Sequence, residues 1–74
     1  MILRDKHQKD VVRALLNAGG ELTRSALTAA MGGGGGRMSD TVNALVADGL
    51  VREFKGDGDR RMVGLTDAGK LARF

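Results

Sequence analysis

Hydrophobic residues recur at a helical spacing near the start of this 74-residue chain. Within residues 5–18 the apolar side chains share one face of a helix with a period of 3.6 residues: Val11, Val12, Leu15, Leu16 and Ala18. Most of the charged side chains of this segment fall on the opposite face. Gly19 and Gly20 follow, and they predict the end of the helix because glycine adopts the left-handed conformation at no steric cost.

A second helix is predicted at residues 23–31, after a short extended link at residues 21–22. Thr23 is suited to cap this helix, because its hydroxyl can accept a hydrogen bond from a backbone N–H of the first turn. Leu27 and Met31 are four residues apart and therefore lie on the same side of the helix. We expect these two side chains to form its buried stripe.

A third helix is predicted at residues 37–48 and is separated from the second by five consecutive glycines, Gly32–Gly36. Its core positions follow the pattern i, i+4, i+7, i+8: Met38, Val42, Leu45 and Val46. A flexible linker here would leave two pieces too short to fold, so we interpret the glycines as a turn that overruns into the helix. Each glycine inside a helix costs about 1 kcal/mol relative to alanine, so its start should fray. A native turn and an altered recognition segment both fit the run.

Residues 50–65 have the pattern of a β-hairpin, with turn residues at positions 56–58. Thr66 is suited to cap a last helix at residues 66–73. The order is helix, helix, tight turn, helix, hairpin, helix. It predicts a mainly α fold with a β-hairpin wing, that is, one winged helix-turn-helix domain over residues 1–74.

Composition argues against an enzyme. The chain has no cysteine, which excludes disulfides, thiolate metal sites and a cysteine nucleophile. It has one histidine, His7, and only two glutamates, and so small a chain can hardly enclose the usual pocket of a few hundred Å³. We therefore expect no enzymatic activity, no cofactor and no metal. No apolar run approaches the roughly 20 residues that cross a bilayer, and the start does not resemble a secretory signal, so we expect a cytoplasmic protein.

The charge balance points to an anionic partner. The formal net charge is +3 and the sequence pI is about 10.0. Residues 1–20 have four cations against two anions and residues 50–74 six against four, whereas residues 21–49 have two against three. Because phosphates attract Lys and Arg whatever the base sequence, we expect double-stranded DNA as the partner and a nucleoid location.

Several segments together resemble the winged helix-turn-helix of MarR-type transcriptional regulators: Leu22-Thr23, Leu27, Leu45, Gly49-Leu50-Val51, Asp59-Arg60-Arg61 and Leu65-Thr66-Asp67-Ala68-Gly69-Lys70. The resemblance covers roughly residues 8–72. It implies a transcriptional regulator, a repressor that occupies an operator, whose third helix enters the major groove while the wing reaches the flanking backbone or minor groove.

The resemblance also implies which residues contact DNA. On the recognition helix they are Arg37, Ser39, Asp40 and Asn43. In the wing they are Arg60 and Arg61, and at the start of the supporting helix they are Thr23, Arg24 and Ser25. The wing arginines also have a simpler interpretation as solvated charges paired with Asp57 or Asp59.

The chain departs from the MarR pattern in three ways. The glycine run occupies positions where such regulators place a cap and DNA-contacting side chains, and Asp40 stands where a cation is frequent. The extra terminal helices through which MarR-like regulators dimerise, and near which they bind ligands, are almost missing. We therefore expect a homodimer or several adjacent sites to be needed for tight binding.

An alternative function is a winged-helix protein-interaction module, such as a small phage or plasmid protein that acts on a larger DNA-binding partner. The negative charge balance of residues 21–49 favours this alternative. Whether the exposed face of the folded third helix is electropositive would discriminate between DNA binding and protein interaction. RNA binding is less favoured because no aromatic side chain is placed to stack bases.

Overall fold

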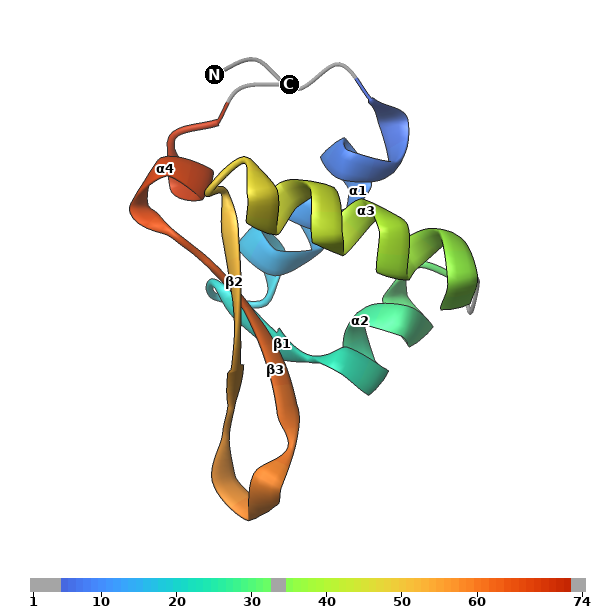
Figure 1. Cartoon of the computed structure of the whole chain (residues 1–74), viewed down its shortest axis with the longest axis vertical. Coiled ribbons are helices and arrows are strands. Elements are labelled where there is room, and N and C mark those ends of the chain that lie inside the picture. The colour runs from blue at the N-terminus through green and yellow to red at the C-terminus, as the bar shows by residue number, and fades with distance from the viewer. Residues whose placement is uncertain (1–4, 33–34, 73–74) are drawn as a thin grey trace.

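The computed structural model describes residues 5–32 and 35–72. Its helices are α1 (Lys6–Asn17), α2 (Arg24–Ala30), α3 (Gly35–Ala47) and α4 (Asp67–Lys70). Its strands are β1 (Glu21–Thr23), β2 (Val51–Lys55) and β3 (Arg61–Leu65), with a 3-10 turn at Asp57–Asp59. Figure 1 shows α1, α2 and α3 packed together while the β2–β3 hairpin projects away from them. The predicted mainly α fold with a wing is confirmed.

Short polar side chains begin the helices where the sequence predicts. Thr23 Oγ1 accepts a hydrogen bond from the backbone N–H of Ala26 at 3.0 Å, and Thr66 Oγ1 accepts one from Gly69 at 3.0 Å. Asp5 caps α1 in the same way. These oxygens satisfy N–H groups that have no partner inside the first helical turn.

Glycine ends α1 as predicted. Gly19 has a φ of +87°, and the N–H of Gly20 donates to the carbonyl of Leu15 at 2.8 Å. The same arrangement ends α3, where Gly49 has a φ of +75°. This left-handed exit satisfies the last carbonyls of each helix and turns the chain toward the next strand.

One hydrophobic core lies between the helices and the sheet. Its buried members come from α1, α2, α3 and the hairpin: Val11, Val12, Leu15, Leu27, Met38, Val42, Leu45, Leu50, Val51, Val63 and Leu65. Met31, predicted beside Leu27 in the buried stripe of the second helix, is only partly buried against this core.

Val46, a predicted core position, is not buried, and neither are Leu16 and Ala18 of the apolar face predicted within residues 5–18. Leu16 is 42 % exposed, Val46 is 39 % exposed and Ala18 is also exposed. The buried face of α3 is centred between Met38 and Leu45, which leaves Val46 beyond its edge and buries Thr41 instead. Thr41 is accommodated because its hydroxyl donates to the carbonyl of Arg37 at 2.9 Å.

The sheet has a third strand, β1, where the sequence predicts only a short extended link. β1 pairs antiparallel with β3, with Leu22 opposite Val63, and β2 pairs with the other edge of β3. The N–H of Leu65 also donates to the carbonyl of Gly20 at 2.8 Å. The base of the wing is therefore tied to the segment that leads into α2.

Two helix boundaries differ from the prediction by two residues or more. α3 begins at Gly35, two residues before the predicted start, so the glycine run does continue into the helix. Gly33, Gly34 and residue 73 lie outside the described residues. α4 ends at Lys70, three residues before the predicted end, and Leu71, which follows it, is 77 % exposed.

Candidate nucleic-acid interface

The start of α2 and the wing form one groove. It has a volume of about 470 Å³ and is lined by Thr23, Arg24, Ser25, Arg60 and Arg61. All five residues were among the predicted DNA contacts, and the fold brings them together although they come from two distant segments. The β1–β3 pairing explains this, because it places Thr23 opposite Met62, next to the wing arginines.

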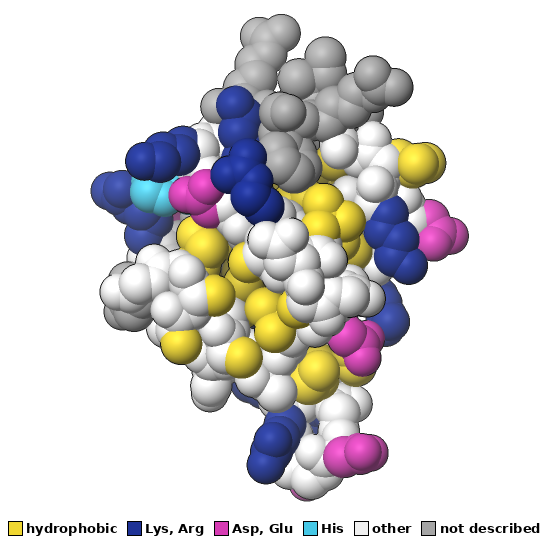
Figure 2. Space-filling view, turned by 180° about the vertical axis from the view of Figure 1, so that it is seen from behind, with side chains coloured by type: hydrophobic (Ala, Val, Ile, Leu, Met, Phe, Trp, Pro, Cys, Tyr) yellow, Lys and Arg dark blue, Asp and Glu magenta, His cyan; other side chains and the backbone are white. Residues whose placement is uncertain are grey.

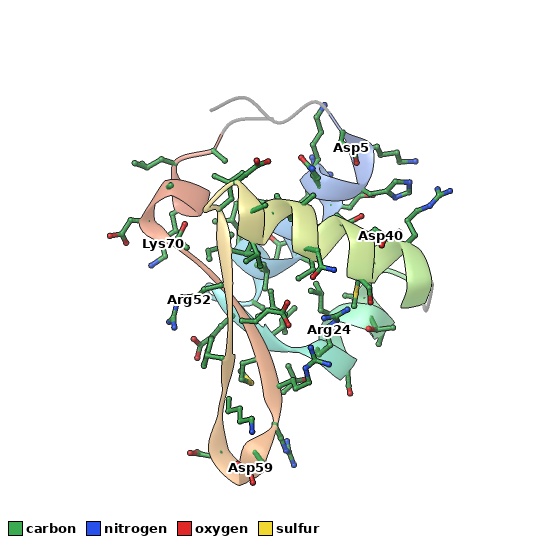
Figure 3. The ribbon with its side chains drawn as sticks, viewed as in Figure 1. Asp5, Arg24, Asp40, Arg52, Asp59 and Lys70 are labelled. Carbon is green, nitrogen blue, oxygen red and sulfur yellow. The ribbon has the colours of Figure 1, made fainter. Side chains whose placement is uncertain are left out.

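Arg24 is a connecting residue within this groove. Its guanidinium donates through Nη2 to Ser39 Oγ at 2.6 Å and lies with Nη1 3.5 Å from Glu53 Oε2. Its side chain is only 19 % exposed. Figure 3 shows Arg24 between the ribbons of α2 and α3. Arg24 therefore joins α2 to α3 and to β2, and sequence reasoning missed Glu53 because nothing in the local pattern marks it.

The two wing arginines differ in their surroundings. Arg61 Nη2 lies 3.3 Å from Glu53 Oε2, so its partner is neither Asp57 nor Asp59. Arg60 is exposed, and within residues 5–32 and 35–72 the structure gives its guanidinium no ion pair or hydrogen bond. Of the two, Arg60 has the guanidinium that is free to bind an external anion.

The predicted recognition-helix residues point in different directions. Asp40 and Asn43 are exposed on α3. Ser39 is half-buried and accepts the hydrogen bond from Arg24, whereas Arg37 Nη1 lies 2.9 Å from Nε2 of His7 on α1. The outward face of α3 thus presents the carboxylate of Asp40 and the amide of Asn43. The cations lie to either side of this face: Arg24 contacts Ser39, and Arg37 contacts His7. This face is not electropositive by itself.

Another cation stands on the outer face of the wing. The guanidinium of Arg52 lies over the ring of Phe54, 4.4 Å from its centroid. A Cβ at Gly64 would meet that ring at 3.2 Å, so the missing side chain lets the ring lie close to β3. A cation held over an aromatic face in this way is attracted by the ring quadrupole.

Other kinds of site find no support in the described part of the chain. Among residues 5–32 and 35–72 no group of His, Asp and Glu side chains converges to hold a metal ion. No helix in those ranges has the length and apolar character that a membrane span requires.

Three packed helices and a β-hairpin make up a winged helix-turn-helix fold, and this fold is similar to that of MarR-type transcriptional regulators, which confirms the resemblance seen in the sequence. The transcriptional regulator PA4135 is similar to this chain with a TM-score of 0.84 and 28% identity over 92% of this chain and 51% of that one. The PcaV transcriptional regulator from Streptomyces coelicolor, solved with its natural ligand, is similar with a TM-score of 0.82 and 24% identity over 92% and 49%.

The chain spans about half the length of each of these two regulators. No protein-family model matches it, and no curated protein is significantly similar in sequence. The comparison therefore concerns the part of the regulators that has the winged helix-turn-helix fold.

Proposed function

We propose that this chain binds double-stranded DNA as part of a transcriptional regulator, with α3 in the major groove and the wing on the flanking backbone. The observation that carries the proposal is the groove between α2 and the wing, which is lined by three arginines, two of them paired with Glu53. Arg24 in that groove contacts Ser39, so the cationic surface borders the recognition helix. Similarity to two transcriptional regulators supports the same function.

The surroundings of each side chain indicate which part of the DNA it contacts. Arg60 contacts a DNA phosphate, because its guanidinium is exposed and unpaired. Ser25, which is exposed at the start of α2, donates a hydrogen bond to the DNA backbone. Asn43 and Asp40 face the bases, where an amide pairs with adenine and a carboxylate accepts from the N4 amino group of cytosine. Residues beside α3 thus provide affinity for DNA, and residues on α3 provide selectivity for the base sequence.

We further propose that the protein acts as a repressor by occupying its operator. A single wing and one recognition helix make few phosphate contacts, so tight binding requires a homodimer or occupation of neighbouring sites. A location on the nucleoid follows from this function.

The test is fluorescence anisotropy of a labelled random-sequence duplex between about 50 and 200 mM salt. We expect log K to fall linearly with log salt, and Arg60→Ala to make the slope shallower by about 0.9, the value for one lost phosphate contact. Lys70→Ala removes the same charge from α4, at the other end of the molecule from the wing tip, and is the matched control.

Two results would contradict the proposal. One is an absence of binding at the lowest salt, and the other is an equal change in slope for Arg60→Ala and Lys70→Ala. The first result would favour the protein-interaction module, and affinity capture with the wild-type chain as bait would then identify its partner.

A further inference from the structure

Glu53 lies where three elements of the interface meet. Its Oε2 is 3.5 Å from Arg24 Nη1 on α2 and 3.3 Å from Arg61 Nη2 on β3. Arg24 in turn donates to Ser39 on α3. A continuous chain of polar contacts therefore runs from the wing through α2 to the recognition helix.

This chain of contacts is partly shielded from solvent. The side chains of Arg24 and Glu53 are 19 % and 27 % exposed. Exposed ion pairs restrain geometry weakly because water screens them and both side chains remain mobile. Arg24 differs, since the rigid planar fork of its guanidinium holds a carboxylate with one nitrogen and a hydroxyl with the other.

Glu53 also occupies a particular position along the wing. It pairs with Val63, which is fully buried, whereas the next inward-facing pair toward the tip, Lys55 and Arg61, is exposed. Glu53 is thus at the point where the hairpin leaves the core. A contact at the base of a projecting arm controls the direction of everything beyond it, including Arg60.

We propose that Glu53 is a positioning residue that fixes the wing against the recognition helix through Arg24 and Ser39. It thereby sets the distance between the groove contact of α3 and the phosphate contact of Arg60. The geometric part of this inference is independent of any ligand, whereas its consequence for DNA rests on the proposed function.

The geometric part is tested without DNA. The chain has no cysteine, so Asp57→Cys at the wing tip and Ala47→Cys at the end of α3 give a clean pair of spin-label sites. Pulsed dipolar spectroscopy then measures the distribution of distances between them. We expect Glu53→Gln to broaden and shift this distribution, because the neutral side chain loses its ion pairs with Arg24 and Arg61.

The matched control is Glu21→Gln, since Glu21 is the other glutamate of the chain and lies in β1, at the opposite edge of the same sheet. It should leave the distribution unchanged. Should Glu53→Gln lose the fold by circular dichroism, Ser39→Ala replaces it, because it removes only the link from Arg24 to α3 and should also broaden the distribution. Equal distributions for the folded variant and the control would overturn the inference.

The consequence for DNA is tested by a double-mutant cycle with a random-sequence duplex. If Glu53 were simply an anion near phosphates, its removal would tighten binding and leave the effect of Arg60→Ala intact. If it positions the wing, Arg60→Ala changes the salt slope less in the Glu53→Gln background than in the wild type. Equal effects of Arg60→Ala in both backgrounds would contradict positioning. A wild type that does not bind DNA would refute the proposed function, and the spectroscopic result would still decide the geometric claim.

Discussion

His7 and Arg37 come from the first turns of two different helices, and the fold places their side chains 2.9 Å apart. Together they line a small hollow of about 160 Å³ whose floor includes Val11 and Met38. A guanidinium has only donors, so Nε2 of His7 accepts the hydrogen bond. The contact of His7 with Arg37 links α1 to the start of α3.

This contact makes a prediction about the proton on the imidazole. With Nε2 as the acceptor, neutral His7 carries its proton on Nδ1. Long-range proton–nitrogen correlation spectra at alkaline pH should therefore show the Nδ1–H tautomer in the wild type. Arg37→Ala should remove that preference, whereas Arg13→Ala, elsewhere on α1, should retain it. Detection of the Nε2–H tautomer in the wild type would contradict the contact.

At the scale of elements, α1, α2 and α3 were predictable because each has a periodic apolar stripe and a local start or stop signal. Thr23 and Thr66 cap helices and Gly19 ends one, as their chemistry predicts. β1 escaped prediction because three residues are too few to show alternation and its partner, β3, is about forty residues away in sequence. Its pairing is decided by tertiary packing, which local propensity does not report.

The candidate interface was predictable to a similar degree. The resemblance indicated the arginines of the groove, and the structure brings them together. It did not indicate that Arg24 is engaged by Glu53 and Ser39, since that contact depends on how three elements pack. The arginines of the groove could be proposed from the sequence, whereas Glu53, which holds Arg24, could not.

The glycines at the start of α3 allow a test at the element scale. Gly35 and Gly36 are helical, so replacing each with alanine should stabilise the protein by about 0.5–1 kcal/mol through the lower backbone entropy of the unfolded chain. Gly32 has a φ of +85°, where alanine is strained, and Gly32→Ala should destabilise instead. Urea denaturation measures both effects. A loss of stability in the first two variants would show that the helix start requires glycine.

At the scale of the whole molecule, the cationic groove and the exposed hydrophobic side chains lie on different parts of the surface (Figure 2). Figure 1 shows α3 in front with the wing extending below it, and the cationic groove lies between α2 and the wing. Figure 2 shows the opposite face, where hydrophobic side chains gather over the middle and charged ones stand mainly around them. A separate groove of about 560 Å³ runs between α1 and α2 and is lined by Leu22, Ala26, Ala30 and Met31 among others.

The surface that we propose to contact DNA comprises α3, the start of α2 and the wing. The outward face of α3 carries Asp40, so its approach to DNA depends on the cations beside it. Removing those cations should weaken binding to every sequence, whereas changing Asn43 should alter the preferred sequence.

The most direct test is a titration of the nitrogen-labelled protein with a short random-sequence duplex at about 50 mM salt, followed by backbone correlation spectra. We expect the largest chemical-shift changes at Ser25, Asp40, Asn43 and Arg60. Resonances of α4 and of the C-terminal half of α1 should move little. Shift changes centred on the groove between α1 and α2, or no changes at this salt concentration, would contradict this expectation.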